Sequence, residues 1–254
     1  MPSWKQGRPH GDPGFCALHH CHSSCCNQCK RRLAPDGTVR PHLLYLHVEK
    51  TGGSSLECAT QNTLIPLGAW SNMGHVTNQD DVRHCMSHCT FDGVAPQKVV
   101  SVRNPYAFAR SMYAYTWSCA WSDWCKRGYQ PWMEFEEFIK SAWQPGGHAT
   151  QSESIRRACG DPCVYDHLLR AESLEDDWID LMIKTDNTVW RLPHANPTEF
   201  GPMGPPPRTV FTKAVTDIIE RTEARLFTEF GYQKRTPPFE LGQEGPHHLA
   251  PGAT

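Results

Sequence analysis

Two groups of residues in this chain have the types and spacing that anion binding requires. The first is a short loop, KTGGSS, which runs from Lys50 to Ser55 directly after an apolar stretch. Its glycines let backbone N–H groups approach an anion, while its lysine and hydroxyls supply a charge and further donors. It is not a Walker A loop, because Lys50 precedes both glycines. The sequence therefore predicts a phosphate cradle, with an ordinary turn and helix cap as the alternative.

The second group lies in SVRNPYAFARS, where Arg103 ends another apolar run and Ser111 follows eight positions later. An arginine fixed at the end of a strand can hold a phosphate in bidentate geometry. A serine about two helical turns further on can donate another hydrogen bond. Together the two groups suit a nucleotide that carries anionic groups at two separate positions, such as a bisphosphorylated adenosine.

An alternation of strands and helices is expected to position these residues. Apolar runs predict buried strands over residues 43–48, 98–102 and 164–169. Periodic patterns predict helices over residues 106–117, 131–143, 173–184 and 211–230. Such alternation implies an α/β fold with a P-loop-like parallel sheet flanked by helices, and ligands bind at the carboxyl ends of such strands.

One domain is expected, over residues 42–235. Residues 1–41 are rich in Pro, Gly, His and Cys and are interpreted as a disordered extension, and residues 236–254 as a flexible tail. The clustered Cys and His residues of the extension match no metal-site spacing, and the same holds for His84 and His88, so no metal site is predicted.

Composition narrows the range of partners. The chain has 254 residues, with 25 basic and 27 acidic side chains and a net charge of −2, which gives no general attraction to nucleic acid. It contains no apolar run of the roughly 18 to 20 residues that span a bilayer, so membrane attachment would need an anchor that this sequence lacks. Twelve cysteines, with Cys119 near Cys125 and Cys159 near Cys163, favour disulfides and an oxidising compartment. The oligomeric state is not indicated.

Both groups of anion-binding residues resemble motifs of one enzyme family. HVEKTGGSSLE resembles the 5'-phosphosulfate loop of the membrane-associated carbohydrate sulfotransferases, and VVSVRNPYAFARSMYAY resembles their 3'-phosphate motif. The resemblance runs from Leu43 to Tyr232, because LLRAESLEDDW and LFTEFGY are similar to later segments of the family. Glu49 departs from it, since the family often has proline there, and a carboxylate beside a polyanion is repulsive unless it points away.

The resemblance implies a single sulfotransferase domain. Such an enzyme transfers a sulfuryl group from 3'-phosphoadenosine 5'-phosphosulfate (PAPS) to a hydroxyl of a glycan or glycoconjugate and releases adenosine 3',5'-bisphosphate. It also implies residence in the Golgi lumen or membrane. Lys50 would contact the oxygen that bridges sulfate and phosphate, and Arg103 and Ser111 would hold the 3'-phosphate. The residues implied at the 5' end are Lys50, Thr51, Gly52, Gly53, Ser54 and Ser55.

A general base is needed, because an acceptor hydroxyl is a poor nucleophile. His75 lies in a Gly-His-Val stretch that resembles the segment carrying the catalytic histidine of uronyl 2-O-sulfotransferases. Glu57, seven residues after Lys50, is the alternative base, and His47 is expected to pack beneath the loop. An exposed loop histidine without a catalytic role is the other interpretation of His75.

Two other functions compete with this one. A catalytically inactive module could bind a nucleotide or a sulfated glycan through the same residues. A P-loop kinase would need ATP and Mg²⁺, and the sequence has no Lys-then-Ser/Thr pair to support it. The aromatic residues between Trp117 and Tyr129 either select the acceptor or fill the core.

Overall fold

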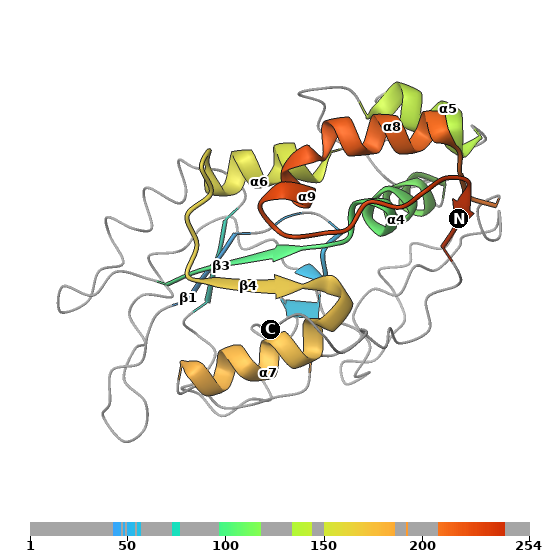
Figure 1. Cartoon of the computed structure of the whole chain (residues 1–254). Helices are drawn as coiled ribbons and strands as arrows, with labels where there is room; N and C mark the ends of the chain where they lie inside the picture. The colour runs from blue at the N-terminus through green and yellow to red at the C-terminus, as the bar shows by residue number, and fades with distance from the viewer. Residues whose placement is uncertain are drawn as a thin grey trace, which may run out of the picture.

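A computed structural model of the chain is shown in Figure 1. It describes residues 43–46, 48, 50–53, 55, 56, 73–76, 97–117, 134–143, 150–185, 192 and 208–241. The predicted N-terminal extension, residues 1–41, lies outside the described residues.

A four-stranded parallel sheet forms the centre of the described structure. Its strands are β1 (Leu43–Leu46), β2 (Met73–Val76), β3 (Gln97–Val102) and β4 (His167–Arg170). Their order across the sheet is β2-β1-β3-β4, and each neighbouring pair is parallel. The prediction of an α/β fold with a parallel sheet flanked by helices is therefore confirmed.

Helices cover both faces of the sheet (Figure 1), and alternate residues of β1 and β3 pack against them. One face is covered by α6 (Gln151–Cys159) and α9 (Ala224–Thr228), which contact Leu46, Val48, Val100 and Val102. The other is covered by α7 (Leu174–Lys184), which contacts Leu43, Tyr45, Val99 and Leu169. Burial on both faces explains why β1 and the last four residues of β3 are mostly apolar.

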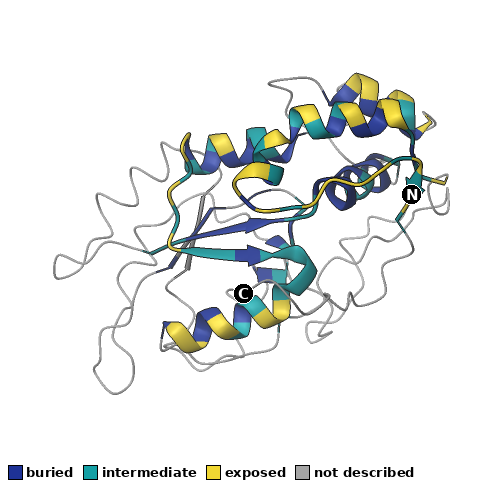
Figure 2. Cartoon of the chain, in the orientation of Figure 1, coloured by how far each residue is buried: buried dark blue, intermediate teal, exposed yellow. Residues whose placement is uncertain are grey.

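A second part of the core lies beyond the carboxyl end of β3. It is formed by α4 (Pro105–Trp117), α5 (Phe135–Ala142), α8 (Lys213–Thr222) and the two-stranded sheet of β5 (Val210–Phe211) and β6 (Phe239–Glu240). Figure 2 shows α4 almost wholly buried among these elements. The ring of Phe239 stacks on that of Phe211 with centroids 4.8 Å apart. The described structure continues to Leu241, and β6 lies beyond residue 235, where the predicted domain ends.

The sequence prediction differs from the structure in several elements. Residues 211–230 were predicted as one helix, but they contain the end of β5 and two helices, α8 and α9, which are separated at the buried Glu223. Strand β4 starts at His167 rather than Val164, and a 3-10 helix, η2 (Ala171–Ser173), precedes α7. Neither β2 nor α6 was predicted.

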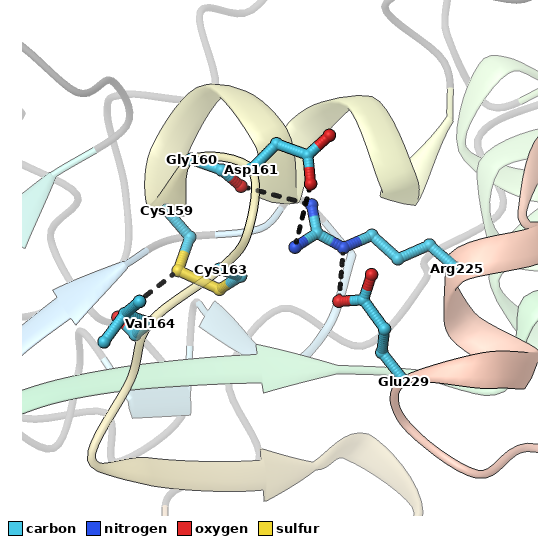
Figure 3. The surroundings of a disulfide bond; sticks show 7 residues. All are labelled: Cys159, Gly160, Asp161, Cys163, Val164, Arg225 and Glu229. Atoms are coloured by element: carbon cyan, nitrogen blue, oxygen red, sulfur yellow. Dashed lines mark hydrogen bonds and ion pairs between the residues drawn. A yellow bond between two sulfur atoms is a disulfide. The ribbon is translucent and has the colours of Figure 1, made fainter.

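A disulfide joins Cys159 to Cys163, as their spacing predicted. It closes the loop between α6 and β4, and Figure 3 shows how α9 holds this loop. The guanidinium of Arg225 donates to the carbonyl of Gly160 at 3.1 Å and to the carboxylate of Glu229 at 2.7 Å. The loop is thus fixed both covalently and by α9. The other predicted pair, Cys119 and Cys125, lies outside the described residues.

Removing this disulfide should lower the stability of the fold. We expect the double variant Cys159→Ser/Cys163→Ser to lose about 2 kcal/mol of unfolding free energy, because so short a loop restricts the unfolded chain only modestly. Urea denaturation of both proteins without reductant measures the difference. Mass spectrometry of non-reduced peptides checks the pairing, and a wild-type peptide map with Cys159 and Cys163 unlinked would contradict it.

None of the helices in the described part of the chain combines the length and apolar character needed to cross a lipid bilayer.

Candidate functional site

The order of the strands defines where a ligand is expected to bind. From β1 the chain moves outward to β2, whereas from β3 it moves in the opposite direction to β4. Such a reversal of direction is a topological switch point, and ligands of parallel α/β sheets commonly bind at the carboxyl ends of the strands beside it. Lys50 follows β1 and Arg103 follows β3, so the two predicted anion-binding groups flank the switch point.

Lys50 and Arg103 are in direct contact. Nη1 of Arg103 donates to the backbone carbonyl of Lys50 at 3.3 Å. Lys50 also has a φ of 60°, in the left-handed region that residues other than glycine seldom adopt. A backbone in this region often marks a site where geometry serves function. The two residues thus lie together, as the rule for parallel sheets predicts, while their roles in binding remain predictions.

The side chain of Lys50 extends toward helix α4. Its Nζ atom lies 4.4 Å from the centre of the Tyr115 ring, which is a cation–π contact. Ser111 precedes Tyr115 by four residues in α4, so both lie on the same face of the helix, one turn apart. The face of α4 that carries Ser111 therefore faces the loop after β1. Lys50 and Arg103 thus lie together, and Ser111 lies one helical turn before the residue that Lys50 contacts.

Beneath the loop, a chain of buried hydroxyl groups joins β1 to β3. The hydroxyl of Thr51 donates to the carbonyl of Val48 at 2.7 Å, so it must accept its second hydrogen bond from Ser101. The Ser101 oxygen in turn accepts from the hydroxyl of Tyr45 at 2.6 Å. Because the Thr51 hydroxyl is used inside the protein, any contact of Thr51 with an anion has to come from its backbone. This series of hydrogen-bonded hydroxyl groups fixes the loop relative to the end of β3.

Gly52 begins the helical turn after this loop. Its carbonyl accepts from the backbone N–H groups of Ser55 at 3.0 Å and Leu56 at 3.3 Å. Its φ is 96°, and a Cβ atom added at this position would lie 2.3 Å from a methyl carbon of Leu174. Both facts require glycine here. Gly53, the next residue, is buried, and Ser55 is partly exposed.

Arg103 and Asn104 form a turn that other elements hold by its backbone. The N–H of Asn104 donates to a carboxylate oxygen of Glu172 at 2.6 Å, and the other oxygen of Glu172 accepts from the hydroxyl of Tyr232 at 3.0 Å. Burial raises the pKa of Tyr232, so this hydroxyl remains a donor at neutral pH. The side-chain oxygen of Asn104 accepts from the N–H groups of Tyr106 at 3.0 Å and Ala107 at 3.3 Å, which caps α4.

Sequence reasoning missed the residues that hold this turn. Gln151 binds both backbone polar groups of Arg103, and Glu172 binds Asn104. No motif marks either residue. The nearest signal for Glu172 was its place in LLRAESLEDDW, directly after the strand that neighbours β3.

The two candidate bases are placed less completely. His75 lies in β2, a strand that was not predicted, where its backbone is paired with Tyr45 of β1. It is the penultimate residue of β2, at the end of the sheet from which the loop after β1 leaves. The side chain of His75 lies outside the described residues, and so do Glu57, Ser54, His47 and Glu49. The strand register places the backbone of His75 level with Tyr45 and Val99, four residues before Arg103 along β3.

No metal site is found in the described part of the molecule, where no three His, Cys, Asp or Glu side chains are placed to share an ion. The clustered Cys and His residues before residue 30, and His84 and His88, lie outside it.

Comparison of the chain with protein-family models, with curated proteins and with solved structures finds no match in any of the three. The functional assignment therefore depends on the two motifs and on the contacts of their residues.

Proposed function

We propose that this chain is a sulfotransferase that transfers a sulfuryl group from PAPS to a hydroxyl of a glycan acceptor. The observation that carries the proposal is the contact between Arg103 and Lys50 at the switch point of the sheet. Two cationic side chains from two adjacent strand ends favour a ligand with two anionic groups. PAPS has this character, because its phosphosulfate and its 3'-phosphate lie at opposite ends of one ribose.

In this proposal Lys50 and Arg103 act on different parts of the donor. The acceptor oxygen attacks sulfur, the bond between sulfur and the bridging oxygen breaks, and the electron pair stays on the phosphate that leaves. The ammonium of Lys50 stabilises the charge that develops on this oxygen, which is where a fixed donor lowers the barrier most. Arg103 and Ser111 hold the 3'-phosphate and so orient the nucleotide. The chemistry needs no metal ion.

His75 is proposed as the base that takes the proton from the acceptor hydroxyl, with Glu57 as the alternative. We expect His75→Ala to lower kcat by about 10²- to 10⁴-fold, because the loss of a general base affects the transition state and not donor binding. The matched control is His167→Ala, since His167 lies in β4 and hydrogen-bonds Gln97 at the amino end of β3. An unaltered kcat in His75→Ala would assign the role to Glu57 or to another group.

The same proposal includes a P-loop-like sulfotransferase domain and a location in the Golgi lumen. The strand order β2-β1-β3-β4, with an anion-binding loop after β1, supports a P-loop-like sulfotransferase domain. The Cys159–Cys163 disulfide supports an oxidising compartment, for which the family resemblance suggests the Golgi lumen.

Transfer of radiolabelled sulfate from PAPS to a panel of glycans and tyrosine peptides tests the activity. We expect label on at least one glycan and none on the peptides, without added Mg²⁺. Label on the peptides alone would overturn the glycan assignment. Binding of adenosine 3',5'-bisphosphate without transfer to any acceptor would indicate an inactive binding module, and turnover that requires ATP and Mg²⁺ would indicate a kinase.

A further inference from the structure

Arg103 continues β3 beyond the point where the sheet supports it. The last pair between β3 and β4 is Val102 with Arg170, so Arg103 lies one residue beyond the paired part of the strand. The side-chain amide of Gln151 pairs with its backbone. Its oxygen accepts from the N–H of Arg103 at 2.7 Å, and its NH₂ group donates to the carbonyl of Arg103 at 2.8 Å. Two hydrogen bonds to one residue fix the orientation of its backbone as a strand partner would.

Gln151 is fully buried and is itself held firmly. It is the first residue of α6, and its backbone N–H donates to one carboxylate oxygen of Glu223 at 2.7 Å. The N–H of Ser152 donates to the other oxygen of Glu223 at 2.7 Å. A carboxylate at the N-terminus of a helix is stabilised by the N–H groups that have no partner within the helix.

Glu223 is an unusual residue to find in the core. Its side chain is fully buried, and burial raises its pKa, while the hydrogen bonds from Gln151 and Ser152 act in the opposite direction. Placing a carboxylate in the core is costly unless it is paired, and the hydrogen bonds from Gln151 and Ser152 offset that cost. It lies between α8 and α9, where it accepts the N–H groups of α6. The interruption between α8 and α9 therefore places the carboxylate of Glu223 where it accepts hydrogen bonds from the N-terminus of α6.

We propose that Gln151, held by Glu223, is a positioning residue that orients Arg103 toward the 3'-phosphate of the nucleotide. This inference rests on the proposed function. The two hydrogen bonds from the amide of Gln151 fix the backbone of Arg103 and thereby place the guanidinium that binds the ligand. If Gln151 served the fold alone, its replacement would not change the preference for a nucleotide with a 3'-phosphate over one without it.

The variant that isolates this role is Gln151→Met. Methionine keeps the length and unbranched shape of glutamine but cannot form either hydrogen bond to Arg103. We expect about a tenfold loss of affinity for adenosine 3',5'-bisphosphate, because two buried hydrogen bonds that orient Arg103 are lost. Affinity for adenosine 5'-monophosphate, which lacks the 3'-phosphate, should not change. In an Arg103→Ala background, Gln151→Met should have no further effect on bisphosphate affinity.

The control is Gln97→Met at the opposite end of the same strand. Gln97 also uses its side-chain amide, in a 2.9 Å hydrogen bond with His167, and its replacement should leave both nucleotide affinities unaltered. If Gln151→Met does not fold, Gln151→Asn retains both polar groups on a shorter side chain and provides the same comparison. The inference is overturned if bisphosphate affinity is unchanged, or if both affinities fall equally. Wild-type protein that binds neither nucleotide would instead reject the proposed function together with the inference.

Discussion

Replacing Lys50 and Arg103 separately is expected to abolish sulfate transfer in two different ways. Lys50→Ala should lower kcat by at least about 10²-fold, because the charge on the leaving oxygen loses its fixed ammonium. Arg103→Ala should weaken binding of adenosine 3',5'-bisphosphate by about 100-fold, because a guanidinium that holds a phosphate in bidentate geometry is lost. Kinetics with labelled PAPS and calorimetry with the bisphosphate separate the two effects.

The positive φ of Lys50 calls for a second variant. Alanine is disfavoured at this φ, whereas asparagine tolerates the left-handed region. Lys50→Asn should therefore lose activity to the same extent while keeping the melting temperature of the wild type. Lys140, an exposed lysine in α5 paired with Glu136 at 2.7 Å, provides the matched control, since Lys140→Ala removes a charge without a role in the site. Full activity in Lys50→Asn would exclude Lys50 from the chemistry.

Gly52→Ala is expected to have the largest effect on the folded structure of the site. A Cβ atom at Gly52 meets Leu174 at 2.3 Å, and alanine is disfavoured at a φ of 96°. The backbone effect amounts to about 1 to 2 kcal/mol, and the overlap adds roughly 1 kcal/mol or more. We expect a fall of about 3 kcal/mol in unfolding free energy by urea denaturation, with weaker bisphosphate binding, since the loop must move away from α7.

Two further variants separate these contributions. Gly231 also has a positive φ, of 72°, but an added Cβ atom there meets nothing within 4 Å. Gly231→Ala should therefore show the backbone effect alone. Adding Leu174→Ala to Gly52→Ala should restore the part of the stability that the overlap removes, which a double-mutant cycle measures. Equal losses in Gly52→Ala and Gly231→Ala would show that the loop does not pack against Leu174.

The elements that the sequence predicted well are those whose signal is local. β1 and the last four residues of β3 are mostly apolar because both faces of the sheet are covered, and α4 has a helical pattern along its whole length. The contact between Lys50 and Arg103 also followed from sequence, because parallel strands bring their carboxyl ends to one edge. The spacing of Cys159 and Cys163 allowed a bridge between them, but the pairing itself is given by the structure.

The elements that were missed depend on distant parts of the chain. β2 has only four residues and lies at the edge of the sheet, so it has no long apolar run. α6 is polar, with only Ile155 and Ala158 as buried apolar residues, and its start is fixed by Glu223. No local pattern shows that Glu223 will divide a helix, or that Gln151 will pair with the backbone of Arg103. Such side-chain to backbone pairing is visible only in the folded chain.

The central claim is that one nucleotide with two anionic ends binds between Lys50 and Arg103. Calorimetric titration of the folded protein with adenosine 3',5'-bisphosphate and, separately, with adenosine 5'-monophosphate tests it most directly. We predict one site per chain, with the bisphosphate bound at least about tenfold more tightly, because only it engages both strand ends. Absence of bisphosphate binding, or equal affinity for the two nucleotides, would contradict the claim.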